Sequence, residues 1–123
     1  MRDVADGDHH AAVMSMSLHH LPTSVVLDAV RELDRVSDGG MTIIDVRRSL
    51  FCMGTLPPLA FLVAPARGRA FAVHDTVTTV RRAYTIPELR CLLDEAGIAS
   101  RYRIGPLPGW NPLRFVAAAV TPR

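Results

Sequence analysis

The sequence predicts a single α/β domain, and three consecutive segments carry this prediction. Residues 10–16 are an almost unbroken apolar run, which suits a strand buried on both faces of a parallel sheet. After a loop at 17–22, apolar side chains recur at helical spacing from Thr23, a candidate N-cap, until Asp38-Gly39-Gly40 ends the helix. Residues 41–46 are then rich in β-branched side chains. Strand, helix and strand form one βαβ unit, right-handed by the usual rule.

The middle of the chain is less regular. Residues 50–66 form its most apolar stretch, which one glycine and three prolines interrupt. This stretch falls short of the ~20 residues that span a bilayer, so it is interpreted as a buried helix or as an apolar lid over a substrate. Residues 67–82 are expected to be a looser connection. Thr85 and Glu88 then form a capping box that begins a helix, and Gly97 ends it.

Two closing strands are expected at residues 100–104 and 113–120. The connection between them is rich in proline and too long for a tight hairpin. Its Trp110 is expected to be a packing anchor. No internal repeat, low-complexity segment or linker divides the 123 residues, so the chain is interpreted as one domain.

Composition excludes several classes of protein. Hydrophobic residues make up 49% of the chain and charged residues only 21%, which excludes intrinsic disorder. The net charge of +2 is too small to indicate a nucleic-acid partner. The acidic N-terminus lacks the apolar core of a signal peptide, so a cytoplasmic protein is expected. Cys52 and Cys91 have no CxxC spacing and are expected to be reduced thiols in or near the core.

Four motifs follow one another along the chain: residues 11–22, AAVMSMSLHHLP; residues 43–49, IIDVRRS; residues 80–90, VRRAYTIPELR; and residues 92–98, LLDEAGI. In this order and spacing they resemble the C-terminal half of a class I S-adenosylmethionine-dependent methyltransferase. The first motif resembles the fourth strand of that family and its following turn, and the second resembles the fifth strand and its exit. The last two resemble the run into the last helix and its end.

The resemblance implies a sheet of order 3-2-1-4-5-7-6 with the seventh strand antiparallel, of which this chain holds only strands 4, 5, 7 and 6. The fold is therefore expected to be a partial Rossmann-like methyltransferase fold, an incomplete three-layer αβα arrangement. Strand four would become a bare edge, which natural proteins rarely leave uncovered. A missing N-terminal portion, a complementary subunit or a second copy in a homodimer is expected to cover it.

The resemblance also implies S-adenosyl-L-methionine as the methyl donor, yet one expected motif is absent. The family holds this cofactor with a glycine-rich turn after its first strand, and the sequence has no GxGxG pattern. Gly39 and Gly40 follow a helix and precede a strand, which is the wrong order. The isolated chain is therefore expected to be inactive or incomplete, supplying mainly the half that binds the acceptor.

By the same resemblance, Asp3 and Val4 lie where the adenine amino group would be held. Ser17 and Leu18 follow the first strand, at the carboxyl edge of the sheet, where they would contact the methionine part of the cofactor. A solvated acid near a chain end is the alternative for Asp3.

His19 and His20 are the candidate catalytic residues, because imidazole titrates near neutral pH and one of them could deprotonate a phenol or enol. The alternative is that the pair only shapes the turn. A metal site with His9 and His10 is not expected, since adjacent side chains of a strand point to opposite faces and no cysteine or carboxylate pattern supports it.

Arg47 and Arg48 leave the second strand at the same edge and are candidates for gripping an anionic substrate. Tyr84 and Phe51 are further candidates for the substrate pocket. Ordinary solvated arginines and a plain packing helix are the alternatives.

Together these features predict methyl transfer to a small hydrophobic acceptor, aromatic or polyketide-like, with oxygen favoured over carbon or nitrogen as the acceptor atom. The alternative is a non-catalytic, methyltransferase-like subunit that docks a partner through its exposed sheet edge. Neither nucleic acid nor a membrane is expected as a partner, although a membrane-peripheral role of residues 50–66 is a third possibility.

Overall fold

The computed structural model describes residues 4–108 and 112–123, which form a four-stranded sheet of order β1-β2-β4-β3. Strand β1 is parallel to β2, whereas β4 is antiparallel to both β2 and β3. This confirms the α/β class, the partial Rossmann-like arrangement and the reversal of the strand next to β2. The strands are β1 (Ala12–Ser15), β2 (Met41–Val46), β3 (Tyr102–Pro106) and β4 (Ala117–Pro122).

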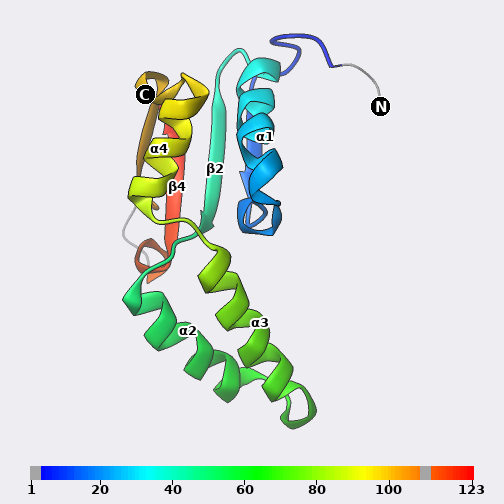
Figure 1. The fold of residues 1–123 in the computed structure, drawn as a ribbon, viewed down its shortest axis with the longest axis vertical. Helices are drawn as coiled ribbons and strands as arrows, with labels where there is room; N and C mark the ends of the chain where they lie inside the picture. Colours follow the sequence, from blue (N-terminus) through cyan, green and yellow to red (C-terminus); the bar gives the residue numbers. More distant parts are fainter. Residues whose placement is uncertain (1–3, 109–111) are drawn as a thin grey trace.

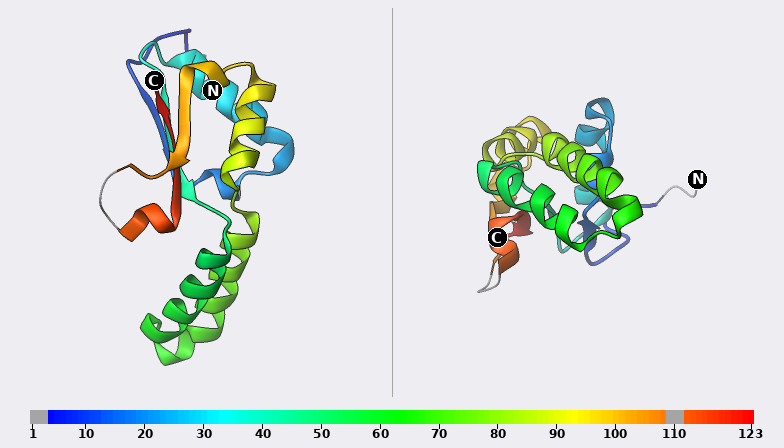
Figure 2. Two further views of the ribbon diagram at one scale, coloured as in Figure 1. Left: turned by 90° about the vertical axis from the view of Figure 1, so that its left-hand side faces the viewer. Right: turned by 90° about the horizontal axis from the view of Figure 1, so that it is seen from below.

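Two helices, α1 (Thr23–Val36) and α4 (Ile86–Ala96), lie side by side on one face of the sheet (Figure 1). In the side view of Figure 2, the other side of the sheet carries only the short 3₁₀ turn at Pro112–Phe115, and no long helix of the described residues covers it. The third layer of the αβα arrangement is therefore missing from this part of the chain, as the sequence predicts.

The main core lies between the sheet and these two helices. Alternate residues of β2, Met41 and Ile43, point to the helices and are almost fully buried. Val30 of α1 and Leu93 of α4 belong to the same buried cluster. The apolar stripe on each helix predicts this packing. The core also contains the following buried side chains: Leu18, Val26, Leu89, Ile98, Tyr102, Ala118 and Val120.

A helical hairpin projects from the carboxyl end of β2, away from the sheet (Figures 1 and 2). It consists of α2 (Leu50–Val63), a short turn, and α3 (Arg69–Arg82). The looser connection predicted for 67–82 is therefore wrong. Val and Thr are frequent in this stretch and lower its intrinsic helix propensity. Packing of α3 against α2 supplies the stability that the local sequence does not indicate.

Four element boundaries also differ from the predictions. Thr23 is not an N-cap: it is the first residue of α1, Pro22 holds the cap position, and no side chain caps the helix. The same helix ends at Val36, before the predicted stop. Both closing strands begin later than predicted, because short 3₁₀ turns at Ala99–Arg101 and Pro112–Phe115 precede them. Trp110 lies outside the described residues.

The capping box of α4 is confirmed, and it yields a test of stability. The backbone N–H of Thr85 donates to Glu88 Oε2 at 2.8 Å, and the backbone N–H of Glu88 donates to Thr85 Oγ1 at 3.3 Å. We expect Thr85→Ala to lower the free energy of unfolding by about 1 kcal/mol, because the helix loses its cap. Thr55→Ala, inside α2, is the control and should be nearly neutral. Urea denaturation measures the unfolding free energy of both variants. Equal losses of stability in the two variants would contradict the role of the cap.

Candidate functional site

The candidate site lies where β1 and β2 end, because ligands of open α/β sheets bind beyond the carboxyl ends of the parallel strands. The chain leaves β1 through Met16, whose φ of 51° is in the left-handed region that side chains rarely adopt. A 3₁₀ turn, η1 (Leu18–His20), follows at once. Such backbone strain is concentrated at functional sites, and here it directs η1 across the end of β2.

A buried histidine–aspartate pair joins the ends of the two strands. Nδ1 of His19 lies 2.5 Å from Oδ1 of Asp45, the second-to-last residue of β2. The backbone N–H of His19 donates to Oδ2 at 2.9 Å, and the backbone N–H of Val46 donates to Oδ1 at 2.7 Å. Both side chains are almost inaccessible, at 3% and 5% exposed. The carboxylate therefore fixes the position of the ring as well as its orientation.

This geometry also determines which nitrogen of His19 can act as a base. An ionised carboxylate only accepts hydrogen bonds, so the proton of a neutral imidazole is on Nδ1 and the lone pair is on Nε2. Among the described residues, no hydrogen bond engages Nε2 of His19. The ring of His20 lies against that of His19, with centroids 4.1 Å apart, and is itself exposed. Of the two predicted bases, His19 is thus the one whose ring orientation is fixed by a carboxylate, and it is buried, whereas His20 is exposed.

Asp45 is the residue of this candidate site that the sequence analysis missed. Its signal was present, since a carboxylate stands inside an otherwise apolar strand. The sequence does not show which residue lies opposite this carboxylate, so it does not indicate a role for Asp45.

Tyr84, Arg47 and Arg48 are brought together beside this pair, as their predicted common role requires. An isolated parallel bridge joins Arg47 to Tyr84, and the backbone N–H of Arg48 donates to the Tyr84 carbonyl at 3.0 Å. Burial raises the pKa of Tyr84, and the negative charges of Glu88 and Asp45 raise it further. Tyr84 is therefore a neutral hydroxyl at physiological pH.

The two arginines differ in what remains free to bind an anion. Arg48 forms an ion pair with Glu88 and donates to the Arg81 carbonyl at 3.3 Å. Hydrogen bonds from Thr85 and the charge of Arg48 lower the pKa of Glu88, so this pair holds its charges at neutral pH. Arg47 donates from Nε to the Phe115 carbonyl at 2.9 Å and has no ion pair among the described residues. Arg47 is thus the more suitable group for a substrate anion.

The predicted cofactor residues are not brought together. Asp3 lies outside the described residues, and the Val4 carbonyl accepts a hydrogen bond from Arg35, in the last turn of α1. That position is at the amino end of β2, opposite the candidate site, so the structure does not support a shared cofactor role for Val4. Ser17 is exposed at the site, whereas the side chain of Leu18 is fully buried in the core.

Phe51 lies at the base of the hairpin and is 51% exposed, against Phe115 at a ring-centroid distance of 5.8 Å. A pocket of about 470 Å³ is lined by Tyr84, by the start of α1 and by one side of α4 from Pro87 to Glu95. Its lining is mainly apolar and includes the exposed thiol of Cys91, which corrects the prediction of a near-core cysteine; Cys52 is buried as predicted.

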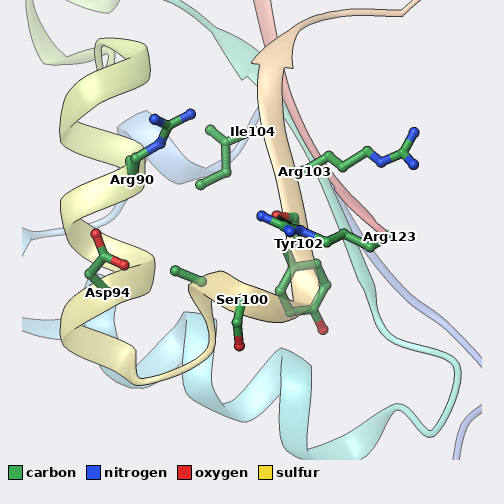
Figure 3. A pocket seen from close by; sticks show the side chains of 8 residues that line it. Arg90, Asp94, Ser100, Tyr102, Arg103, Ile104 and Arg123 are labelled. Carbon is green, nitrogen blue, oxygen red and sulfur yellow. Dashed lines mark hydrogen bonds between the residues drawn. The ribbon is translucent and has the colours of Figure 1, made fainter.

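A larger pocket of about 570 Å³ lies at the far end of the molecule (Figure 3). Arg90 and Asp94 of α4 line it opposite Tyr102 at the start of β3. The Tyr102 hydroxyl accepts from the backbone N–H of Met41, the first residue of β2, so this pocket is at the amino end of that strand. None of the predicted site residues reaches it, and we assign the candidate site by the His19–Asp45 geometry instead.

The described residues contain neither a metal-binding cluster nor a membrane-spanning helix. No group of three or more histidine, cysteine, aspartate or glutamate side chains is placed to hold a metal ion. No helix in residues 4–108 and 112–123 is long and apolar enough to cross a membrane.

Comparison with known proteins supports the fold alone. No family model matches the chain, and no curated protein matches its sequence. Among solved structures, a SAM-dependent methyltransferase from Aquifex aeolicus matches with a TM-score of 0.53 and 18% sequence identity. The match covers 96% of this chain but 47% of that one, so the chain spans about half the length of this structural neighbour. The chain therefore has a methyltransferase-like α/β fold, and nearly all of it takes part in the likeness.

Proposed function

We propose that this chain is the acceptor-binding half of an S-adenosylmethionine-dependent methyltransferase. The observation that carries the proposal is the buried His19–Asp45 pair, located at the carboxyl ends of β1 and β2 in a methyltransferase-like fold. A buried imidazole whose tautomer is fixed by a carboxylate is suited to accept a proton from a substrate.

The proposed reaction needs one proton acceptor and good positioning. Nε2 of His19 takes the proton of an acceptor hydroxyl, and Asp45 stabilises the imidazolium that results. The acceptor oxygen is thereby made nucleophilic for the methyl group that S-adenosyl-L-methionine supplies. Arg47 offers a positive charge near the same edge for an anionic group of the acceptor.

The described residues do not hold this methyl donor by themselves. Leu18 is turned into the core, Val4 is at the opposite end of the sheet, and no glycine-rich turn stands beside Ser17. We therefore assign only the proton transfer and the binding of the acceptor to this chain.

The exposed side chains near the site favour a hydrophobic acceptor. Phe51 and Phe115 form an aromatic pair, and apolar side chains continue along α2 as far as Val63. Aromatic and aliphatic linings select apolar ligands, and a few polar groups orient them. An aromatic or polyketide-like hydroxyl compound fits this combination, with α2 as its cover.

A second candidate function, a non-catalytic subunit, is favoured by a different observation, the unpaired edge of β1. A non-catalytic subunit would dock its partner through β1, and Nε2 of His19 would have no proton to accept. The two functions are therefore separated by testing His19 directly.

The test is to titrate the ¹⁵N-labelled chain with 1-naphthol and, separately, with naphthalene. We expect naphthol at millimolar concentration to shift the His19 side-chain signals, because its hydroxyl reaches Nε2, whereas naphthalene leaves them unchanged. His19→Gln should abolish the discrimination, and His20→Gln should preserve it. Absence of any hydroxyl-dependent change at His19 would contradict the proposed function and favour the non-catalytic subunit.

A further inference from the structure

The end of the helical hairpin that lies farthest from the sheet is apolar and exposed (Figure 1). Residues 59–71, the hairpin tip, comprise the last turns of α2, the 3₁₀ turn η2 (Ala66–Gly68) and the start of α3. The tip contains two arginines, and each of its other residues is apolar or glycine. Its large exposed side chains are Leu59, Phe61, Leu62, Val63 and Phe71. A contiguous exposed surface of this kind indicates a binding surface.

Helix α2 has no polar face at the tip. Phe61, Leu62 and Val63 are consecutive, so their side chains point about 100° apart around the helix, and all three are exposed. A helix on the surface of a folded domain normally presents charged residues to water and apolar residues to the core. α2 packs mainly along α3 and has no charged residue between Leu50 and Val63. A helix that is apolar on all sides is typical of an apolar environment, either a protein core or lipid.

Polar groups of the hairpin are bonded within the hairpin itself, as an apolar medium requires. The hydroxyl of Thr55 in α2 donates to the Phe51 carbonyl at 2.7 Å. Pro65 has no N–H, and its carbonyl accepts a backbone N–H of η2 at 2.8 Å. At the end of α2, where carbonyls lack helical partners, Nε of Arg69 donates to the Ala64 carbonyl at 3.3 Å. Transfer of these groups into an apolar medium would therefore break no hydrogen bond.

The charges of the tip indicate which apolar medium it fits. Arg67 and Arg69 are its only charged residues, and residues 46–74 contain no aspartate or glutamate. Neither arginine forms an ion pair in the part of the chain that the structure describes. The Arg69 guanidinium lies 5.2 Å from the centre of the Phe61 ring, so its side chain runs along apolar surface. Arginines beside exposed aromatic and aliphatic side chains are complementary to the surface of an anionic lipid bilayer.

The length of the hairpin fits contact with one side of a bilayer. Each helix has 14 residues and is therefore ~21 Å long at 1.5 Å per residue. The hydrocarbon core is ~30 Å thick, so the hairpin is too short to cross it. Peripheral helices bury their apolar side chains ~5–10 Å deep, which the tip alone provides. Asp75 is exposed about one turn beyond the tip and would stay in water.

A second copy of this chain is a less suitable occupant of the tip. Two tips packed against each other would bring together the arginines of both copies, and neither tip contains a carboxylate. Like charges that are removed from water without a counter-charge disfavour such an interface. The phosphates of an anionic lipid supply the counter-charge that a second tip lacks.

We propose that the hairpin tip inserts into the surface of an anionic lipid bilayer. Its apolar side chains lie among the outer acyl chains, and its two arginines lie at the lipid phosphates. The sheet stays in water, and Phe51 at the base of α2 stays beside the candidate site. Of the roles considered for residues 50–66, this is the membrane-peripheral one. It stands on the hairpin tip alone and does not depend on the proposed function.

The first experiment measures co-sedimentation of the chain with vesicles. We expect binding to vesicles of phosphatidylglycerol and phosphatidylcholine in equal parts, and about tenfold weaker binding to phosphatidylcholine alone. Leu62→Ser should weaken binding to the anionic vesicles about tenfold, because a leucine no longer leaves water. The matched control is Leu50→Ser, which should bind like the parent, since Leu50 is 93% exposed at the opposite end of α2. Equal losses in the two variants, or no binding to either vesicle, would overturn the proposal.

The second experiment removes positive charge from the tip. The double variant Arg67→Gln, Arg69→Gln should bind anionic vesicles about tenfold more weakly than the parent, with a smaller dependence on salt. Its matched control, Arg90→Gln with Arg103→Gln, removes the same charge from exposed positions of α4 and β3 and should bind like the parent. Equal effects of the two double variants would mean that net charge, not the tip, attracts the lipid, and would overturn the proposal.

A third measurement separates insertion from adsorption. Phe71→Trp should be quenched by lipids with brominated acyl chains, whereas Leu50→Trp should show no quenching beyond that of the parent; Trp110 is present in both variants. Equal quenching of the two would contradict insertion of the tip. Self-association that depends on Leu62, without vesicle binding, would assign the tip to a second copy and overturn the proposal.

Membrane binding and the proposed function fail independently. His19→Gln should bind vesicles like the parent, because His19 is buried at the candidate site and not at the tip. Loss of the hydroxyl-dependent response at His19 therefore leaves the membrane proposal standing. Absence of vesicle binding likewise leaves the proposed function standing.

Discussion

Replacing Asp45 with asparagine is expected to lower the free energy of unfolding by about 3 kcal/mol, because a buried carboxylate that accepts three hydrogen bonds becomes an amide that can accept them at one oxygen only. The usual total for a small domain is about 5–15 kcal/mol, so this single atom exchange removes a large part of the stability. It should also change the tautomer of His19.

The reason is that Asp45 accepts hydrogen bonds with both oxygens. Oδ1 faces the ring of His19 and the Val46 N–H, and Oδ2 faces the backbone N–H of His19. In asparagine one of these positions becomes an NH₂ group, which only donates. If it faces the backbone, two donors meet and a hydrogen bond is lost. If it replaces Oδ1, it meets the Val46 N–H, so a hydrogen bond is lost there as well; Nδ1 of His19 must then accept, and the proton moves to Nε2.

Two measurements check this prediction. Urea denaturation gives the loss of stability, with Asp28→Asn as the matched control; Asp28 is 80% exposed, and its variant should lie within about 0.5 kcal/mol of the parent. Long-range ¹H–¹⁵N correlation of the histidine side chains gives the tautomer. A His19 that carries its proton on Nε2 in the parent protein would contradict the assigned base, whatever the stability of the variant.

The same pair shows what sequence analysis can and cannot predict. The capping box of α4 was predicted correctly because its two partners are three residues apart, within the reach of a local rule. Strand β2 was predicted to the residue because its β-branched run is bounded by Gly40 and by two arginines. His19 and Asp45 are 26 positions apart, so only the parallel register of β1 and β2 brings them together.

The hairpin illustrates a second limit. Its helix α3 has a composition that suits a strand or a loop, and its partner α2 contains two adjacent prolines inside the helix. A helix at 50–66 was predicted despite these prolines, whereas α3 was not. Each helix is stabilised by the other and by the small buried cluster at the base, around Val80 and Cys52. Conversely, the likeness of the N-terminus to a strand exit predicted a cofactor contact for Val4, and tertiary contacts with Arg35 place that residue at the other end of the sheet.

The contrast between the buried core and the exposed hairpin leads to the remaining large effect. Leu93→Ala is expected to lower the free energy of unfolding by about 2–5 kcal/mol, since the variant leaves a cavity between α4 and the sheet. Leu93 is fully buried in the main core. The identical change at Leu62, which is 72% exposed near the tip of the hairpin, should have almost no effect on the isolated chain.

Urea denaturation compares both variants with the parent protein. The comparison is valid when all three proteins show the same slope of unfolding free energy against urea concentration. A substantial loss for Leu62→Ala would mean that the tip of the hairpin is buried in solution, by self-association or by closure onto the sheet, and would contradict the exposed arrangement. A neutral Leu62→Ala beside a strongly destabilised Leu93→Ala would show that folding of this chain does not require the apolar tip. The exposed leucines of α2 would then indicate a surface that contacts another molecule, because contiguous exposed apolar side chains that folding does not need are typical of binding sites.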